Sequence, residues 1–179
     1  MLSKIENLSE YFQAYEKSVA NPETFWERVA NQFYWRKKWD RVVDFNFEKA
    51  EVKWFENAKL NITENLLDRH LYTLGEKPAI IWEPNDPNEE GITLTYQQLF
   101  EKVCEFSNVL KNNGIRKGDR VIIYMPMIPE AAVAMLACAR VGAVHSVVFA
   151  GFSSSALADR INDCKAKMVL TSDGNFRGA

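Results

Sequence analysis

The sequence predicts an α/β fold, in which a helical and aromatic N-terminal extension wraps onto the start of a mostly parallel, helix-covered sheet. From residue 78 onward, strand-like and helix-like runs alternate, and crossovers of this length build parallel sheets with helices on their faces. The first seventy residues instead hold four of the five tryptophans and show no long regular period. With 47% apolar and 26% charged residues, the 179-residue chain can bury a sizeable core.

The N-terminal part is expected to be a wrapping segment. Asn21, Pro22 and Glu23 predict the start of a helix, because proline and an acidic residue suit the first helical turn. Apolar residues spaced three and four apart form the expected buried face of this helix: Phe25, Trp26, Val29 and Phe33. Residues 37–60 are short, aromatic and turn-like, so their large rings are expected to dock onto a neighbouring domain.

A helix and a β-hairpin are expected between the N-terminal part and the long helix that follows. Residues 62–74 read as a helix capped by Asn61 or Thr63 and ended by Gly75. Residues 79–82 and 92–95 read as two short strands, and the polar loop between them, which contains proline and aspartate, indicates a hairpin with a long connection.

A long amphipathic helix is predicted over residues 96–113. Thr95 is its expected cap, and Asn113 with Gly114 is its expected stop. Five apolar residues share one face of this helix: Leu99, Val103, Phe106, Val109 and Leu110.

The remaining pattern is strand, helix, strand, helix, strand. The helix over residues 130–141 is apolar on nearly every side, which predicts that it is sandwiched between other elements. The other helix starts at the serines of 153–155 and ends at Cys164. The three strands are expected at residues 120–125, 145–149 and 167–171.

Composition argues against several classes of protein. Lys and Arg total 22 against 24 for Asp and Glu, giving a net charge of −2, so no broad positive field favours nucleic acid or anionic lipid. The start of the chain lacks a secretory pattern, and Arg140 interrupts the longest apolar stretch, so neither secretion nor membrane spanning is expected. Cys104, Cys138 and Cys164 lack CxxC spacing and read as reduced, buried thiols of a cytoplasmic protein.

The turns after the three predicted parallel strands are the places where a ligand is expected. Residues 126–129 lack a GxGxxG motif and have two prolines, which disfavours dinucleotide binding. Residues 150–155 place a glycine and three serines at a helix N-terminus. This pattern suits an anion, but a simple serine cap has the same appearance and is the commoner explanation. In the third turn, the guanidinium of Arg177 has the geometry to hold a phosphate.

Other chemistry is not indicated. His70 and His145 have no Ser, Cys or metal-ligand partner at a recognisable spacing, so both read as structural histidines. The sequence has no P-loop, no zinc-ligand spacing and no nucleophile elbow. The residues alone therefore predict a cytosolic α/β domain with an anion-binding edge.

The exact amino-acid sequences of two segments indicate more about the family of the protein than the spacing of their residues does. Residues 124–143, YMPMIPEAAVAMLACARVGA, and 145–153, HSVVFAGFS, closely resemble the acetyl-coenzyme A synthetases, a family within the adenylate-forming acyl-CoA synthetase superfamily. Trp54-Phe55, Leu60-Asn61 and residues 65–70 are similar to the N-terminal extension of the same family. The resemblance implies that residues 1–70 are this extension and that 71–179 are the first part of the AMP-binding domain, the large domain of these enzymes.

The resemblance also implies an activity and part of a site. Members join acetate to ATP, with Mg²⁺, as acetyl-adenylate, and then transfer the acetyl group to coenzyme A (CoA), releasing AMP. Arg177, Gly178 and Ala179 match the start of the family's motif for the 3′-phosphate end of CoA. Ala150 and Gly151 match its CoA wall, although many members have glycine where Ala150 stands. No lysine matches the family's catalytic lysine, and the catalytic, ATP and metal sites are expected beyond residue 179.

The chain stops directly after an expected core strand, so we expect it to be the opening portion of a longer enzyme, inactive alone, whose partners are small-molecule substrates and its own C-terminal portion. Two alternatives remain open. A propionyl-CoA synthetase is one, because the acid pocket is expected outside this sequence and one methylene is discriminated only there. A non-catalytic binding or scaffold module, using its aromatic segment or last strand to recruit a partner, is the other.

Overall fold

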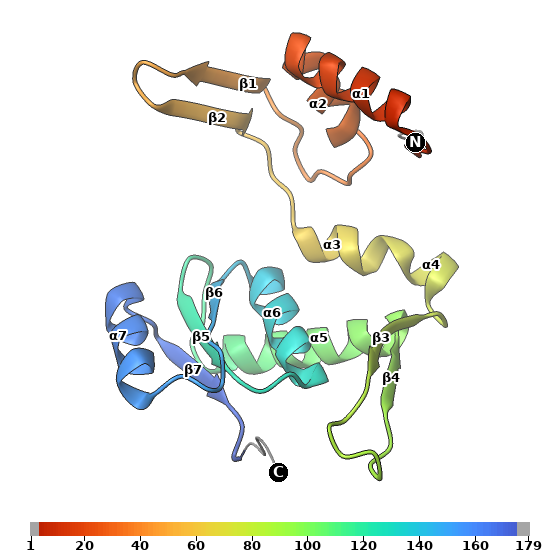
Figure 1. The fold of residues 1–179 in the computed structure, drawn as a ribbon. Coiled ribbons are helices and arrows are strands. Elements are labelled where there is room, and N and C mark those ends of the chain that lie inside the picture. Colours follow the sequence, from red (N-terminus) through yellow and green to blue (C-terminus); the bar gives the residue numbers. More distant parts are fainter. Residues whose placement is uncertain (1–3, 175–179) are drawn as a thin grey trace. The chain divides into compact units, whose positions relative to one another are not determined.

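The structure is a computed structural model that describes residues 4–174. The chain divides into two compact units, Met1–Asn61 and Ile62–Ala179, and each is described by itself (Figure 1). Among the described residues, no helix combines the length and apolar character needed to cross a membrane.

The first unit begins with two helices, α1 (Leu8–Ala20) and α2 (Pro22–Ala30). The expected start of α2 is confirmed, since the Asn21 side chain accepts a hydrogen bond from the Thr24 N–H and proline follows the cap. Helix α1 was not expected. Its signal is a local one, because the Asn7 side chain accepts from the Glu10 N–H while the Glu10 carboxylate accepts from the Glu6 N–H.

The turn-like interpretation of residues 37–60 was wrong. This segment holds an antiparallel hairpin of β1 (Arg41–Asn46) and β2 (Glu51–Glu56). The connection lacks glycine and proline, and it is closed by the Asn46 side chain accepting from the Lys49 N–H and by a positive φ of 52° at Ala50. The hairpin was missed because these are weak turn signals.

The large rings of this unit contact one another. Trp35 lies 5.2 Å from Trp39 and 5.3 Å from Phe55, and the Trp26 and Trp54 rings meet edge to face at 6.1 Å, all measured between ring centroids. The rings therefore form a small aromatic cluster that holds α2 and the hairpin together.

The second unit opens with three short helical pieces rather than the single expected helix. They are α3 (Ile62–Leu66), the 3₁₀ turn η1 (Asp68–His70) and α4 (Leu71–Leu74), which ends at Gly75 as expected. The break falls at Leu67, whose side chain is buried in the core, next to Asp68, which binds Arg140. These two tertiary contacts outweigh the local preference for one continuous helix.

The hairpin and the long helix of this unit are as expected. Strands β3 (Pro78–Trp82) and β4 (Ile92–Thr95) pair antiparallel, and α5 spans Tyr96–Asn112. Thr95 forms a capping box with Gln98, in which each side chain accepts the other's backbone N–H. On the expected apolar face of α5, Leu99, Val103 and Leu110 are buried and Phe106 is half-buried, whereas Val109 is 47% exposed.

A three-stranded parallel sheet forms the centre of the second unit. Its strands are β5 (Arg120–Tyr124), β6 (Val144–Val147) and β7 (Met168–Thr171), in the order β6-β5-β7. Helix α6 (Pro129–Val141) connects β5 to β6, and α7 (Ser154–Cys164) connects β6 to β7. Because the two crossovers run in opposite directions along the sheet, right-handed connections place α6 and α7 on opposite faces, as Figure 1 shows.

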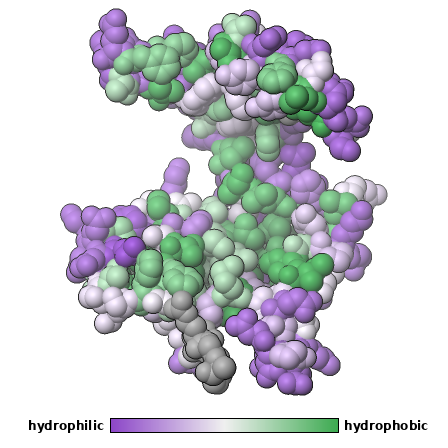
Figure 2. Space-filling view, viewed as in Figure 1, coloured by the Kyte–Doolittle hydropathy of each residue, from purple (hydrophilic) through white to green (hydrophobic). Residues whose placement is uncertain are grey.

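The core of the second unit lies between α5, α6 and β5. The three central residues of β5, Val121, Ile122 and Ile123, are completely buried, and so are Ala134, Ala137 and Cys138 of α6. The sandwiched position expected for α6 is thus confirmed. Apolar residues also reach the surface between α7 and the β3–β4 hairpin (Figure 2).

Candidate functional site

The carboxyl ends of the three parallel strands meet at one edge of the sheet. In the register, Ile123 lies opposite Val147 of β6, and Tyr124 lies opposite Thr171 of β7. The three turns singled out from the sequence therefore leave the sheet from the same edge. This edge is the candidate functional site.

The turn after β6 carries the two CoA-wall candidates within the described residues. Ala150 is half-buried and Gly151 is exposed. The segment is anchored on one side by the buried Val148, whose N–H donates to the Ile123 carbonyl at 2.9 Å. The Tyr124 hydroxyl lies 3.0 Å from the Ala150 carbonyl oxygen and 2.8 Å from that of Phe152.

The serines that follow this turn cap helix α7. The Ser153 hydroxyl accepts from the Ala156 N–H and lies 2.9 Å from the Ser155 hydroxyl. The Arg160 guanidinium lies over the Phe152 ring, 4.8 Å from its centroid. The structure thus supports the serine-cap interpretation of this turn, and it also leaves a cation and an aromatic ring beside it.

The turn after β5 is tied to the β3–β4 hairpin. The Trp82 indole donates to the Met127 carbonyl oxygen at 2.6 Å, and Pro129 opens α6. The turn after β7 is described only to Gly174, whose carbonyl accepts from the Ser172 hydroxyl. Arg177, Gly178 and Ala179 lie outside the described residues.

The groups with a shifted pKa lie away from this edge. Burial raises the pKa of the Cys138 thiol to about 11, so this thiol is protonated and unreactive at neutral pH. A hydrogen bond to Asp68 raises the pKa of Arg140. The bond from Lys167 and that from the Arg116 N–H lower the pKa of Asp119. These three groups belong to packing contacts rather than to a reactive site.

The two histidines lie in packing contacts, and none of the three cysteines forms a disulfide. The His70 ring lies edge to face with Tyr96 at 6.0 Å, and His145 sits in β6 opposite Val121. All three cysteines are free; Cys138 is buried, whereas Cys104 and Cys164 are only half-buried. Within residues 4–174, no three His, Cys, Asp or Glu side chains gather closely enough to hold a metal ion.

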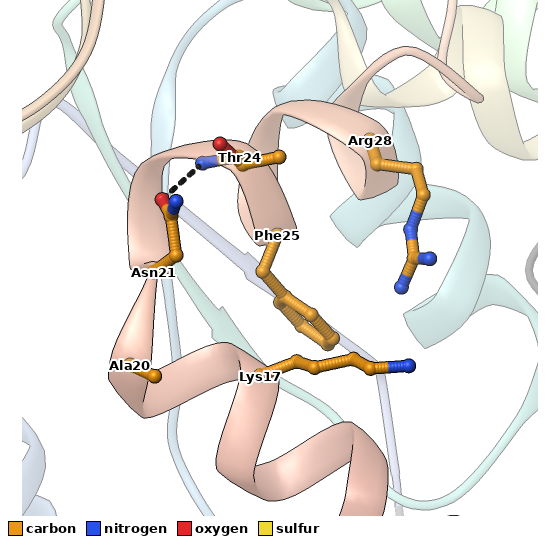
Figure 3. A pocket seen from close by; sticks show the side chains of 6 residues that line it. All are labelled: Lys17, Ala20, Asn21, Thr24, Phe25 and Arg28. Atoms are coloured by element: carbon orange, nitrogen blue, oxygen red, sulfur yellow. Dashed lines mark hydrogen bonds between the residues drawn. The ribbon is translucent and has the colours of Figure 1, made fainter.

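The first unit has a separate cavity of about 240 Å³ between α1 and α2 (Figure 3). The Phe25 ring forms its wall, the Arg28 guanidinium lies 5.4 Å from the centroid of that ring, and the Lys17 side chain runs along the opening. Its lining has no carboxylate, thiol or imidazole, so it offers a binding surface rather than a catalytic centre.

The family models place the chain in a known class. Residues 67–178 match the model "AMP-binding enzyme", and residues 11–66 match "Acetyl-coenzyme A synthetase N-terminus". Because the first match spans more than half of the sequence, the chain belongs to the AMP-binding enzyme family.

The similar proteins are more specific. The chain is 54% identical over 173 residues to an acetyl-coenzyme A synthetase of Saccharophagus degradans, and 51% identical over 181 residues to that of Drosophila melanogaster. These matches cover 96% and 97% of this chain but 27% of each relative, so the chain spans about a quarter of their length.

A solved structure agrees with this assignment. The acetoacetyl-CoA synthetase of Streptomyces lividans superimposes with a TM-score of 0.80 at 30% identity, over 89% of this chain and 24% of that one. The expected α/β class, the start of the large domain of an adenylate-forming enzyme, is thereby confirmed.

Proposed function

We propose that this chain is the N-terminal part of an acetate–CoA ligase that forms AMP. The observation that carries the proposal is the identity of just over one half, along nearly the whole chain, to proteins named acetyl-coenzyme A synthetase. In this proposal residues 1–70 are the N-terminal extension and 71–179 are the first part of the AMP-binding domain. Three free cysteines fit a reducing, cytoplasmic location.

The proposed reaction has two steps. An acetate oxygen attacks the α-phosphorus of ATP, and the bond to pyrophosphate breaks. The CoA thiolate then attacks the carbonyl carbon of acetyl-adenylate, and the bond to the AMP oxygen breaks. Mg²⁺ would offset phosphate charge in the first step. The ATP and metal sites are proposed to lie in the part of the full-length enzyme that this chain does not span, as the family resemblance implies.

The contribution of this chain is to CoA binding. Ala150 and Gly151, at the carboxyl edge of the sheet, are proposed to form the wall against which the CoA nucleotide lies. Arg177, Gly178 and Ala179 are proposed to begin the turn that receives its 3′-phosphate, where a guanidinium suits the charge.

The function is tested with the full-length protein and with the isolated 179 residues. We expect the full-length protein to catalyse acetate-dependent ATP–pyrophosphate exchange. With CoA present, it should convert acetate to acetyl-CoA faster than it converts propionate to propionyl-CoA. The isolated chain should do neither. A preference for propionate would replace acetate by propionate as the proposed substrate. Turnover by the isolated chain would contradict the proposal that the catalytic, ATP and metal sites lie outside these 179 residues.

The CoA site is tested by Arg177→Ala in the full-length protein. Loss of one charge-assisted contact should raise the KM for CoA by an amount equivalent to roughly 1–3 kcal/mol, with a smaller change for ATP. Arg177→Lys keeps the charge but loses the two-pronged guanidinium contact, so its KM for CoA should lie between that of the parent and that of Arg177→Ala. An unchanged KM for CoA would refute the assignment of Arg177.

A further inference from the structure

The Tyr124 hydroxyl joins the end of the central strand to the turn that carries the proposed CoA wall. We propose that Tyr124 is a positioning residue, whose phenol holds residues 150–152 in the conformation that receives the CoA nucleotide. This inference rests on the proposed function, and it concerns a side chain to which the sequence analysis assigned no role.

The position of Tyr124 in the sheet suits this task. It is the last residue of β5, which lies between β6 and β7, and its hydroxyl reaches the carbonyl oxygens of Ala150 at 3.0 Å and Phe152 at 2.8 Å. A single phenolic hydrogen is thus shared between two acceptors that flank Gly151. One side chain therefore sets the orientation of two peptide groups, one on each side of the glycine.

The orientation of these carbonyls also fixes two backbone donors. All peptide bonds of the described residues are trans, so within one peptide plane the N–H points opposite to the C=O. With the Ala150 and Phe152 carbonyls turned toward the phenol, the N–H groups of Gly151 and Ser153 point away from it. Neither N–H has a protein acceptor within residues 4–174. The inference assigns these two N–H groups to a polar ligand at the wall.

The turn needs such a fastening because it is exposed. Gly151, Phe152 and Ser153 all lie at the surface. The preceding anchor is the Val148 bond to Ile123, and the following one is the Ser153 cap of α7. Between these anchors the phenol supplies the bonds to β5, and a turn held in its binding conformation loses less conformational entropy when the ligand arrives.

The test compares Tyr124→Phe with the parent in the full-length protein. Phenylalanine keeps the ring and removes only the hydroxyl. We expect the KM for CoA to rise about 3- to 10-fold, which is the net effect of one neutral hydrogen bond. The acetate-dependent ATP–pyrophosphate exchange, measured without CoA, should change less than about two-fold, because it does not use the wall. Thermal unfolding measured in parallel shows that the variant is folded.

A second measurement separates the wall from the phosphate contact. With 3′-dephospho-CoA as the substrate, Tyr124→Phe should raise the KM by the same factor as with CoA, whereas Arg177→Ala should affect CoA alone. The matched control is Tyr72→Phe, a fully exposed tyrosine, which should change nothing.

Three outcomes would overturn the inference. They are a KM for CoA within two-fold of the parent, an equal loss of exchange and CoA-dependent activity, and an effect confined to CoA bearing the 3′-phosphate. Absence of exchange in the parent protein would instead refute the proposed function, and the inference would fall with it.

Discussion

At the scale of single residues, Arg140 contacts three other elements of its unit. Its guanidinium donates to both oxygens of the Asp68 carboxylate at 2.8 Å and to the Thr63 hydroxyl at 3.3 Å. It also lies 5.0 Å from the centroid of the Phe100 ring. Arg140 thus joins α6 to α5 and to the first helical turns of its unit. It has a structural role beyond interrupting the longest apolar stretch of the sequence.

Loss of this network should destabilise the protein. We expect Arg140→Met to lower the free energy of unfolding by roughly 1–3 kcal/mol, because Asp68 would be left half-buried without its partner. Arg140→Lys should cost less, since it keeps the charge but cannot form the two-pronged contact. Urea unfolding followed by circular dichroism measures both.

The matched control is the surface pair Arg41–Asp44, whose charged atoms lie 3.0 Å apart with about half of each side chain exposed. Arg41→Met should cost less than about 1 kcal/mol. Equal effects at the two arginines would show that the contacts of Arg140 contribute nothing beyond a surface charge pair.

At the scale of elements, Asp119 organises the start of the parallel sheet. One carboxylate oxygen accepts from the Arg116 N–H at 2.8 Å, and the other lies 2.7 Å from the Lys167 ammonium. The Asp119 carbonyl accepts from the Val144 N–H, so the starts of β5, β6 and β7 all depend on this residue. The hydrogen bond from Lys167 is the largest cause of the lowered pKa of Asp119.

This contact makes stability depend on pH in acid. Because the folded pKa lies below the ordinary value of 3.8, the stabilisation is fully present well above pH 3.8 and is lost as pH falls through the folded pKa. The parent should therefore exceed Asp119→Asn in stability near neutral pH, and the difference should shrink below about pH 4. Urea midpoints between pH 3 and 7 measure this difference.

The control for this series is Asp159→Asn, an exposed residue of α7. Its difference from the parent should stay flat over the same range. A constant difference for Asp119→Asn as well would contradict the role of its ionised carboxylate.

The C-terminus of α6 depends on a glycine. Gly142 has a φ of 82°, and a Cβ there would lie 3.1 Å from the Lys117 side chain. Gly142→Ala should cost roughly 1–2 kcal/mol for the left-handed conformation, plus the displacement of Lys117. Gly114→Ala is the comparison, because Gly114 has a similar φ of 83° with open space around it. Thermal unfolding should rank Gly142→Ala as the less stable variant; the reverse order would contradict the contact.

The elements of the second unit were predictable because local and tertiary signals agree there. Thr95 caps α5, Gly142 ends α6 and Ser153 caps α7, each next to an apolar run of the right period. In the first unit the signals are separated. The face of α1 is largely exposed, and the β1–β2 connection relies on Asn46 instead of glycine, so neither element was recognised.

At the scale of the whole molecule, the position of the candidate site could be predicted from the sequence, whereas the contacts that hold its turns in place could not. Parallel strands bring their carboxyl ends together, so the three turns followed from the strand pattern. The role of Tyr124 did not, because only the folded chain shows its hydroxyl reaching across 26 and 28 residues to Ala150 and Phe152. A tyrosine that closes a run of buried β-branched residues was the available signal.

The exposed edge strand β6 predicts self-association of the 179-residue chain. Val144 and Val147 are 56% and 54% exposed, on a strand that, among residues 4–174, pairs with β5 alone. Unpaired edges with apolar side chains promote contact between chains. Sedimentation velocity should show association that grows with concentration, and Val144→Thr with Val147→Thr should weaken it. Monodisperse behaviour of the unaltered chain at high concentration would contradict the prediction.

The bond between Trp82 and Met127 has an optical consequence. Trp82 is the one tryptophan in residues 62–179, and its indole donates to the turn that follows β5, three residues from Tyr124. Replacement of the four N-terminal tryptophans by phenylalanine would leave, within these 179 residues, emission from Trp82 alone. Indole emission shifts with the polarity and hydrogen bonding around the ring, so the chain carries its own fluorescent reporter beside the carboxyl edge of the sheet.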